Sequence, residues 1–116
     1  MKTKLKKIYL KKIIKNGKYL FIYPISSVFI IEKRNNEQHS SINLIGTLVK
    51  KKKFRKSVSR NRIKRLLKAS FFLNKCIFKK KDKIYYVIFI YQTLYFPNYK
   101  NIDDSVKKIL NKIKCY

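Results

Sequence analysis

The sequence contains few of the residues that bind metals or carry out acid–base chemistry. Its 116 residues include one histidine, two cysteines and five acidic residues. Cys76 and Cys115 have no CxxC spacing and no neighbouring group of histidine or carboxylate residues, so the chain predicts neither a zinc site nor a redox pair. His39 lies in the polar stretch RNNEQHSS, which is typical of an exposed loop, and has no visible partner for proton transfer. We therefore expect reduced thiols, no metal ligand and no catalytic residue in this chain.

No hydrophobic run in the sequence is long enough to suggest a membrane span. The longest, from Tyr19 to Ile31, falls short of the roughly 20 apolar residues that a transmembrane helix needs. A basic segment precedes it, as in a secretory signal, but a small-residue cleavage site is missing and the charged residues 32–34 follow directly. Its composition favours β-structure, and Pro24 divides it into two strands because proline cannot donate to a central ladder. We expect no membrane partner and a cytoplasmic location.

Charge of one sign dominates the composition. Thirty-one lysine and arginine residues against five acidic residues give a formal net charge of +26. Such a balance destabilises the compact chain through self-repulsion and favours an anionic partner. Nucleic acid is the leading candidate, and an anionic membrane surface is the alternative. The apolar content of 46% suffices for one core in a chain of this length, so we expect a single domain over residues 1–116.

Hydrophobic periodicity predicts the order helix, three strands, helix, strand, helix. The predicted helices span residues 4–15, 57–74 and 103–114, and the predicted strands span residues 18–22, 25–33, 42–49 and 84–93. The last strand, IYYVIFIYQT, is apolar on both faces, which is typical of a central strand in a sheet covered on both sides. Asp103 and Asp104 are expected in the first turn of the last helix, where the helix dipole favours negative charge. The order predicts an α+β fold with helices packed on a four-stranded sheet.

The most distinctive stretch is the basic segment from Lys50 to Lys68, KKKKFRKSVSRNRIKRLLK. Helical periodicity places an apolar stripe on one side of it, opposite a polar face. The stripe consists of Ile63, Leu66, Leu67 and Phe71, and the polar face of Asn61, Lys64, Arg65 and Lys68. Burying each apolar side chain contributes roughly 1.5–3 kcal/mol, whereas each pair of neighbouring cations costs a few tenths of a kcal/mol, so burial dominates. We expect Ser57 or Ser59 to cap the helix, and a polyanion to neutralise its polar face.

The basic helix resembles a signature of the protein subunit of bacterial ribonuclease P. The family's R-N-x-x-K-R core matches Arg60 to Arg65. Residues 46–52 are similar to the preceding strand end of the family, residues 54–58 to a form found in some bacterial branches, and residues 15–18 to the end of its first helix. The likeness covers about residues 5–114. It implies an α+β fold in the order α-β-β-β-α-β-α, with an unusual left-handed β-α-β crossover (ribosomal protein S5 domain 2-like).

The resemblance implies a protein that binds RNA and leaves the chemistry to it. In the family, the basic helix and adjoining loop bind the catalytic RNA subunit, and Mg²⁺ held mainly by the RNA and substrate supports hydrolysis. Carried onto this sequence, the RNA-binding residues are Lys51, Lys52, Arg55, Arg60, Asn61, Arg62, Lys64, Arg65 and Lys68. A merely solvated basic face is the simpler interpretation, but arginine and asparagine concentrate at the head of this helix, and arginine donates in a planar fork suited to phosphate. The chain would assist endonucleolytic removal of the 5′ leader from precursor tRNA, without requiring a protein partner.

The resemblance also implies a cleft between the first helix and the sheet that binds the single-stranded leader. Leu10 and Ile14 stand where many members of the family have phenylalanines, and Phe29 stands at the aromatic position of the following strand. Aliphatic side chains lose most of the base stacking, which is worth about 1–3 kcal/mol per base. We therefore expect weaker leader binding or a transfer of stacking to other aromatic residues.

Three alternatives remain open. The aromatic residues that share one face of the last strand either take over the stacking or belong to the core, and we favour the core for Tyr85, Phe89 and Tyr91. A basic ribosomal protein of similar fold would share the charge and the order of elements, but would not require an intact R-N-x-x-K-R. A cationic membrane-active protein would need apolar faces exposed in the folded state.

Overall fold

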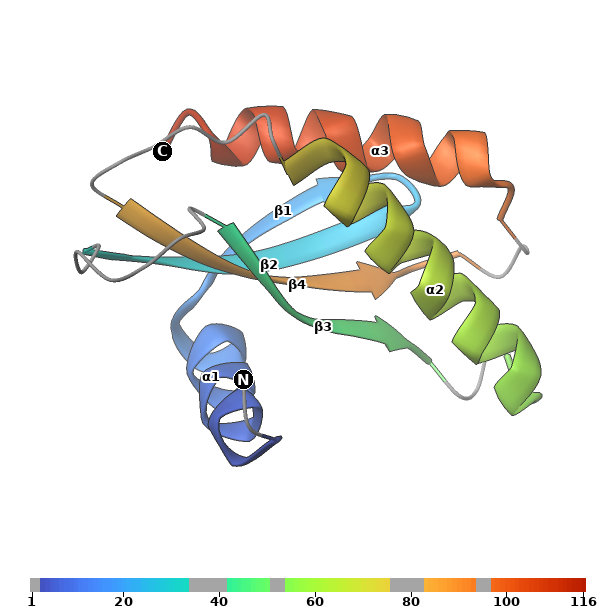
Figure 1. Ribbon diagram of the computed structural model, residues 1–116, viewed down its shortest axis with the longest axis horizontal. Coiled ribbons are helices and arrows are strands. Elements are labelled where there is room, and N and C mark those ends of the chain that lie inside the picture. Colours follow the sequence, from blue (N-terminus) through green and yellow to red (C-terminus); the bar gives the residue numbers. More distant parts are fainter. Residues whose placement is uncertain (1–2, 34–41, 51–53, 76–82, 94–96) are drawn as a thin grey trace.

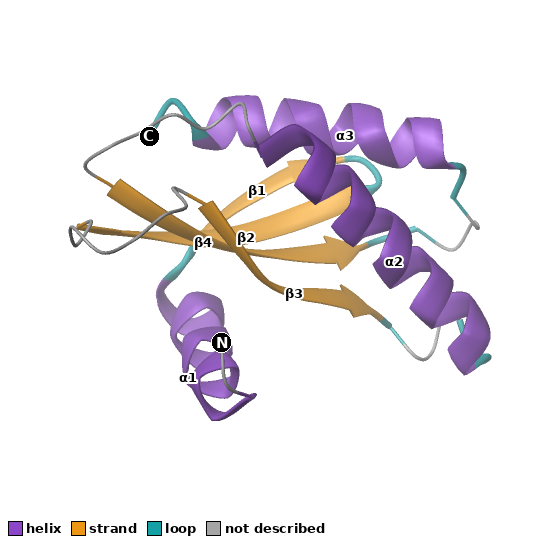
Figure 2. Cartoon of the chain, in the orientation of Figure 1, coloured by secondary structure: helices purple, strands orange, loops and turns teal. Residues whose placement is uncertain are grey.

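The computed structural model describes residues 3–33, 42–50, 54–75, 83–93 and 97–116. Its elements follow the predicted order (Figure 2). Their bounds are α1 Thr3–Asn16, β1 Lys18–Ile22, β2 Ile25–Lys33, β3 Ile42–Val49, α2 Ser57–Asn74, β4 Lys83–Tyr91 and α3 Tyr99–Ile113. The first three strands and α2 have the predicted bounds, whereas β4 ends two residues early and α3 begins four residues early.

The strands form one mixed sheet in the order β1-β2-β4-β3. β1 pairs antiparallel with β2, and β2 pairs antiparallel with β4, so that Val28 lies opposite Ile88. β3 runs parallel to β4, and the chain between them passes through α2. This β3–α2–β4 connection leads from the edge strand β3 to the inner strand β4 and places α2 on the same face of the sheet as α3 (Figure 1). The left-handed sense of the crossover stays a prediction from the resemblance.

Helices cover both faces of the sheet and divide the apolar residues into two cores. α2 and α3 lie on one face, and α1 lies on the other (Figure 1). The larger core, beneath α2 and α3, includes Ile63, Leu67 and Phe71 of the predicted apolar stripe, with Leu66 at its margin. The smaller core, beneath α1, includes Ile13 and the β4 residues 84, 86 and 88. β4 contributes to both cores, which confirms that it is a central strand.

α3 begins by a mechanism that the sequence reading missed. Asn98 occupies the capping position, and its Oδ1 accepts a hydrogen bond of 2.9 Å from the backbone N–H of Asn101. The first turn contains no acidic residue, so the placement of Asp103 and Asp104 beside the helix dipole was wrong. Asn98 can cap the helix because its side chain reaches a free N–H of the first turn, whereas Asp103 and Asp104 lie beyond that turn.

The predicted serine cap of α2 is also wrong. α2 begins at Ser57, and the capping position belongs to Lys56, which makes no side-chain capping hydrogen bond. The carbonyl oxygen of Lys56 accepts the first helical bond, from the N–H of Arg60 at 3.2 Å. Both candidate serines therefore lie inside the helix, past the position from which a hydroxyl can cap it.

Candidate RNA-binding surfaces

The basic face of α2, defined by Asn61, Lys64, Arg65 and Lys68, points away from the sheet. Asn61, Arg65 and Lys68 are exposed and Lys64 is half-buried, while Ile63 and Leu67 on the opposite side are fully buried. The apolar stripe thus fixes the rotation of the helix about its axis and keeps the cations in solvent. Of the other predicted RNA-binding residues, Arg55 and Arg62 are exposed, and Lys51 and Lys52 lie outside the described residues.

Acidic side chains do not neutralise the basic face of α2 in the described part of the chain. Glu32 forms an ion pair with Lys12 at 2.6 Å, on the opposite face of the sheet. Asp103 forms an ion pair with Lys107 at 2.9 Å within α3. Arginine and lysine side chains that lack an internal counterion keep their full attraction for phosphate. The positive field of α2 is therefore available to an anionic partner.

Arg60, the first residue of the R-N-x-x-K-R motif, has a side chain that binds the protein itself. Its Nη1 donates hydrogen bonds of 2.8 Å to the carbonyl oxygens of both Phe54 and Arg55. The Phe54 ring lies 6.0 Å from that of Tyr91, so the same loop is attached to the sheet. Arg60 therefore shapes the entry to α2 in addition to any contact it makes with RNA. Its helical position, one turn before Ile63 and two turns before Leu67, is the sequence signal that could have predicted this inward orientation.

The three residues predicted for a leader cleft do not come together. Leu10 packs against the smaller core beneath α1, and Ile14 is 47% exposed on the same helix. Phe29 is 1% exposed and belongs to the larger core on the other face of the sheet, where its ring meets Tyr116 edge-on at 5.2 Å. The assignment of Phe29 to the cleft was wrong because strand residues alternate between faces, and Val28 and Ile30 are the neighbours that face α1.

The aromatic residues of β4 belong to the core, as we favoured. Tyr85, Phe89 and Tyr91 are each at most 1% exposed. The hydroxyl of Tyr85 donates to the carbonyl oxygen of Tyr116 at 2.7 Å, so a tyrosine in the core has a partner for its polar atom. Burial, followed by the nearby Tyr23, raises the pKa of Tyr91 to about 12. None of these three rings can stack on a base without unfolding the sheet.

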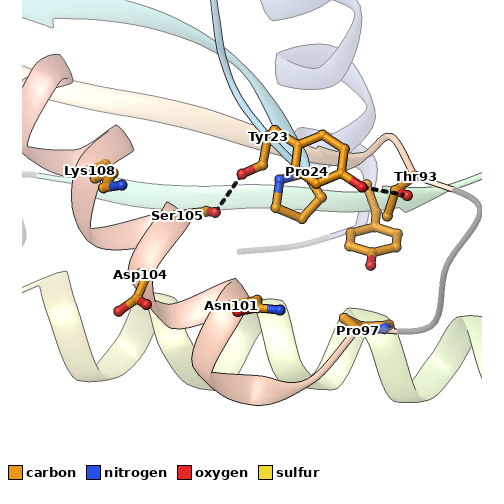
Figure 3. A pocket seen from close by; sticks show the side chains of 9 residues that line it. Tyr23, Pro24, Thr93, Pro97, Asn101, Asp104, Ser105 and Lys108 are labelled. Atoms are coloured by element: carbon orange, nitrogen blue, oxygen red, sulfur yellow. Dashed lines mark hydrogen bonds between the residues drawn. The ribbon is translucent and has the colours of Figure 1, made fainter.

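Hollows lie beside the sheet at two places in the described part of the chain. One, of about 390 Å³, lies between the β1–β2 turn and the first turns of α3, with Tyr23, Pro24 and Thr93 facing Asn101 and Ser105 (Figure 3). There the hydroxyls of Tyr23 and Thr93 lie 3.0 Å apart, and Ser105 Oγ donates to the Tyr23 carbonyl oxygen at 2.8 Å. The hydroxyl of Ser105 is thus engaged in holding α3 to the β1–β2 turn.

The second hollow, of about 360 Å³, lies between α1 and the outer end of β2. It is lined by Lys12, Asn16, Lys18 and residues 29–32, and the ion pair between Lys12 and Glu32 crosses it. The described residues contain no group of three or more His, Cys, Asp or Glu side chains that could hold a metal ion. Across the same residues, no helix has the length and apolar character to cross a membrane.

Comparison with known proteins places this geometry in a family. The profile of the family described as Ribonuclease P matches residues 5–114. The ribonuclease P protein component of Porphyromonas gingivalis is 29% identical over 119 residues, which cover 96% of this chain and 85% of the relative. The ribonuclease P protein component of a Pseudanabaena species is 33% identical over 78 residues, which cover 67% of this chain and 66% of the relative.

Solved structures share the fold. The ribonuclease P protein of Staphylococcus aureus superposes with a TM-score of 0.69 at 23% identity, covering 92% of this chain and 90% of that one. The ribonuclease P protein of Thermotoga maritima gives a TM-score of 0.69 at 23% identity, covering 100% and 97%. The profile match extends over nearly the whole chain, including the R-N-x-x-K-R helix and every strand of the sheet. The chain therefore belongs to the ribonuclease P protein family, the family of the protein component that acts in the maturation of tRNA 5′ ends.

Proposed function

We propose that this chain binds the catalytic RNA of ribonuclease P through the basic face of α2 and holds the 5′ leader of precursor tRNA on the side of the sheet that carries α1. The observation that carries the proposal is the basic face itself, whose exposed cations have no acidic partner among the described residues. A helix whose other side is locked into a core presents these charges as a rigid array, which reduces the entropy lost on binding.

The chain assists cleavage by electrostatics and positioning. Its cations neutralise phosphates and release condensed counterions, which raises the affinity of the RNA for a second polyanion, the precursor. Arg65 and Arg62 offer planar donor forks that suit phosphate oxygens, whereas Lys64 and Lys68 act as point charges. Mg²⁺ that supports hydrolysis is held mainly by the RNA subunit and the substrate, as the resemblance implies. The proposed location is the cytoplasm, where bacterial precursor tRNA is processed.

The decisive experiment is reconstitution with the matching catalytic RNA at low Mg²⁺, scored by cleavage of a precursor tRNA. We expect the wild-type protein to stimulate cleavage, because its cations replace part of the screening that Mg²⁺ would supply. Replacing Lys64, Arg65 and Lys68 together with alanine should weaken binding to the catalytic RNA and remove most of the stimulation. The matched control replaces three exposed lysines of α3 with alanine, namely Lys100, Lys108 and Lys112. This control variant has the same net charge as the α2 variant.

The control shows whether RNA binding depends on the position of the cations on α2 or only on the total positive charge of the protein. If both triple variants lose the same affinity, the basic face has no special role and total charge alone carries binding. If the wild-type protein fails to stimulate cleavage at any Mg²⁺ concentration, the proposed function is wrong. Strong binding to anionic liposomes that survives high salt, together with negligible RNA affinity, would instead support a membrane-active protein.

A further inference from the structure

The face of the sheet that carries α1 is only partly covered. Paired residues of neighbouring strands share a face, and Tyr19, Val28, Ile88 and Gly46 form one such row across all four strands. α1 lies over this row, because the hydroxyl of Tyr19 donates to the carbonyl oxygen of Ile14 at 3.2 Å, and Val28 and Ile88 are fully buried. α1 is the only described helix on this face (Figure 1).

The next row on the same face is open at both edges of the sheet. It consists of Phe21, Ser26, Ile90 and Leu48. Phe21 is 58% exposed and Leu48 is 38% exposed, whereas Ser26 between them is nearly buried. We call this row, together with Tyr19 at the edge of the row beside it, the open face. Phe21 and the exposed Tyr19 lie on the same face of one edge strand, and exposed apolar side chains that gather in this way indicate a surface that a partner covers.

Two exposed aromatic rings stand side by side on the open face. Tyr19 is 63% exposed, and Phe21 lies two residues along the same edge strand. Because alternate residues of a strand share a face and each residue advances the chain by about 3.3 Å, the two rings are attached roughly 6.6 Å apart. That spacing suits two successive bases of an extended single strand. The third exposed aromatic of this segment, Tyr23, belongs to the turn and bonds to Thr93 instead.

The net charge of the chain favours a polyanion as the partner of the open face. Lys12 and its partner Glu32 mark one flank of α1, next to the far end of β2. At 100° per residue from the buried Ile13, Ile14 lies on the other flank, where its carbonyl oxygen bonds to Tyr19, and Lys11 points toward solvent. A second copy of this chain, with a net charge of +26, would repel rather than complement this surface. A single-stranded nucleic acid suits exposed rings on so cationic a chain, because its bases stack and its phosphates are anionic.

We propose that Tyr19 and Phe21 form a stacking platform for two bases of single-stranded RNA, namely the 5′ leader of precursor tRNA. The proposal rests on the proposed function, and assigns the stacking to edge strand β1 rather than to α1 or to the buried Phe29. β1 runs along the rim of the sheet, so the leader lies along β1.

The test measures the affinity of the reconstituted holoenzyme for a precursor tRNA with a leader and for the same tRNA without one. The double variant Tyr19→Ala/Phe21→Ala should bind the substrate with a leader about tenfold or more weakly, and the leaderless tRNA unchanged. Phe21→Trp should keep the wild-type affinity, since indole also stacks. Phe72→Ala removes a ring of similar exposure (59%) at the far end of α2 and should have no leader-dependent effect.

Each other outcome overturns the proposal in a distinguishable way. If the wild-type holoenzyme gains no affinity from the leader, the leader-binding part of the proposed function is wrong and the platform is wrong with it. If the wild-type protein gains affinity from the leader and the double variant gains the same amount, leader binding stands and the platform is wrong. If sedimentation shows that the wild-type protein is a dimer and the double variant a monomer, while leader affinity is unchanged, the platform is wrong. The open face is then a contact between copies of the chain.

Discussion

The guanidinium group of Arg60 donates a 2.8 Å hydrogen bond to the carbonyl oxygen of Phe54, six residues earlier in the chain. The bond ties the first residue of the R-N-x-x-K-R motif to the loop that enters α2. Because the Phe54 ring also contacts Tyr91, the loop, the helix and the sheet are joined at one point. The motif therefore contains both a residue that organises the surface and residues that present charge on it.

Arg60→Ala should destabilise the free protein as well as weaken RNA binding. The substitution leaves two backbone carbonyl oxygens without their charged donor, and we expect the free energy of unfolding to fall by about 1–2 kcal/mol. Urea denaturation in the absence of RNA measures this change. An unchanged unfolding midpoint would mean that the two bonds contribute nothing to the fold and that Arg60 serves RNA alone.

Arg65→Ala should show the opposite pattern. Arg65 is exposed on the basic face of α2, so stability without RNA should stay within about 0.5 kcal/mol of wild type. Its removal should lower the slope of log affinity against log salt concentration by roughly one phosphate contact. Lys112→Ala, an exposed cation of α3, is the control and should leave the slope unchanged. Equal slopes for both variants would contradict the placement of Arg65 against phosphate.

The order of elements, the central position of β4 and the buried stripe of α2 were all predictable from the sequence. These features depend on hydrophobic periodicity, which is local and strong. The family signature at Arg60 to Arg65 was readable for the same reason, since it occupies consecutive turns of one helix. The profile match to the ribonuclease P family confirms the identification made from these residues.

Other features depended on contacts between distant residues. The face on which Phe29 lies is set by the register of β2, and an error of one residue moves a side chain to the opposite face. Asp103 read as a helix-terminal charge, but it bonds instead to Ser70 and Asn74 of α2. The sequence could not show that the ring of Phe21 is exposed while other aromatic rings are in the core. The burial of side chains on an edge strand depends on how far α1 extends over the sheet.

Gly17→Ala should destabilise the protein because α1 joins β1 through a crowded contact. The N–H of Gly17 donates to the carbonyl oxygen of Ile13 at 2.7 Å. A Cβ at residue 17 would collide with that oxygen and lie 2.7 Å from Val28 Cγ1, so backbone and core must both shift. We expect a loss of roughly 1–3 kcal/mol in the free energy of unfolding, measured by urea denaturation. In Gly46→Ala the new Cβ meets only Leu10 Cδ2, at 3.3 Å, and a comparable loss there would contradict this explanation.

Asp103 should make stability depend on pH in the acid range. Its carboxylate accepts 2.8 Å hydrogen bonds from Ser70 Oγ and Asn74 Nδ2 and pairs with Lys107, thereby joining α2 to α3. The hydrogen bond from Lys107, followed by that from Ser70, lowers the pKa of Asp103 below its usual value of 3.8. A carboxyl with a lowered folded-state pKa stabilises the protein above its unfolded pKa, and this contribution is lost as pH falls through the folded value.

Asp103→Asn should therefore cost stability at neutral pH and little in strong acid. We expect the variant to lose roughly 1–3 kcal/mol of unfolding free energy at pH 7, because bonds to a charged acceptor become bonds to a neutral one. The difference from wild type should shrink once the pH falls below about 4, where the wild-type carboxyl begins to take up its proton. Asp104→Asn, at an exposed neighbour, controls for net charge. If urea denaturation gives a constant difference between Asp103→Asn and wild type from pH 7 to pH 2, the charge of Asp103 does not hold α2 and α3 together.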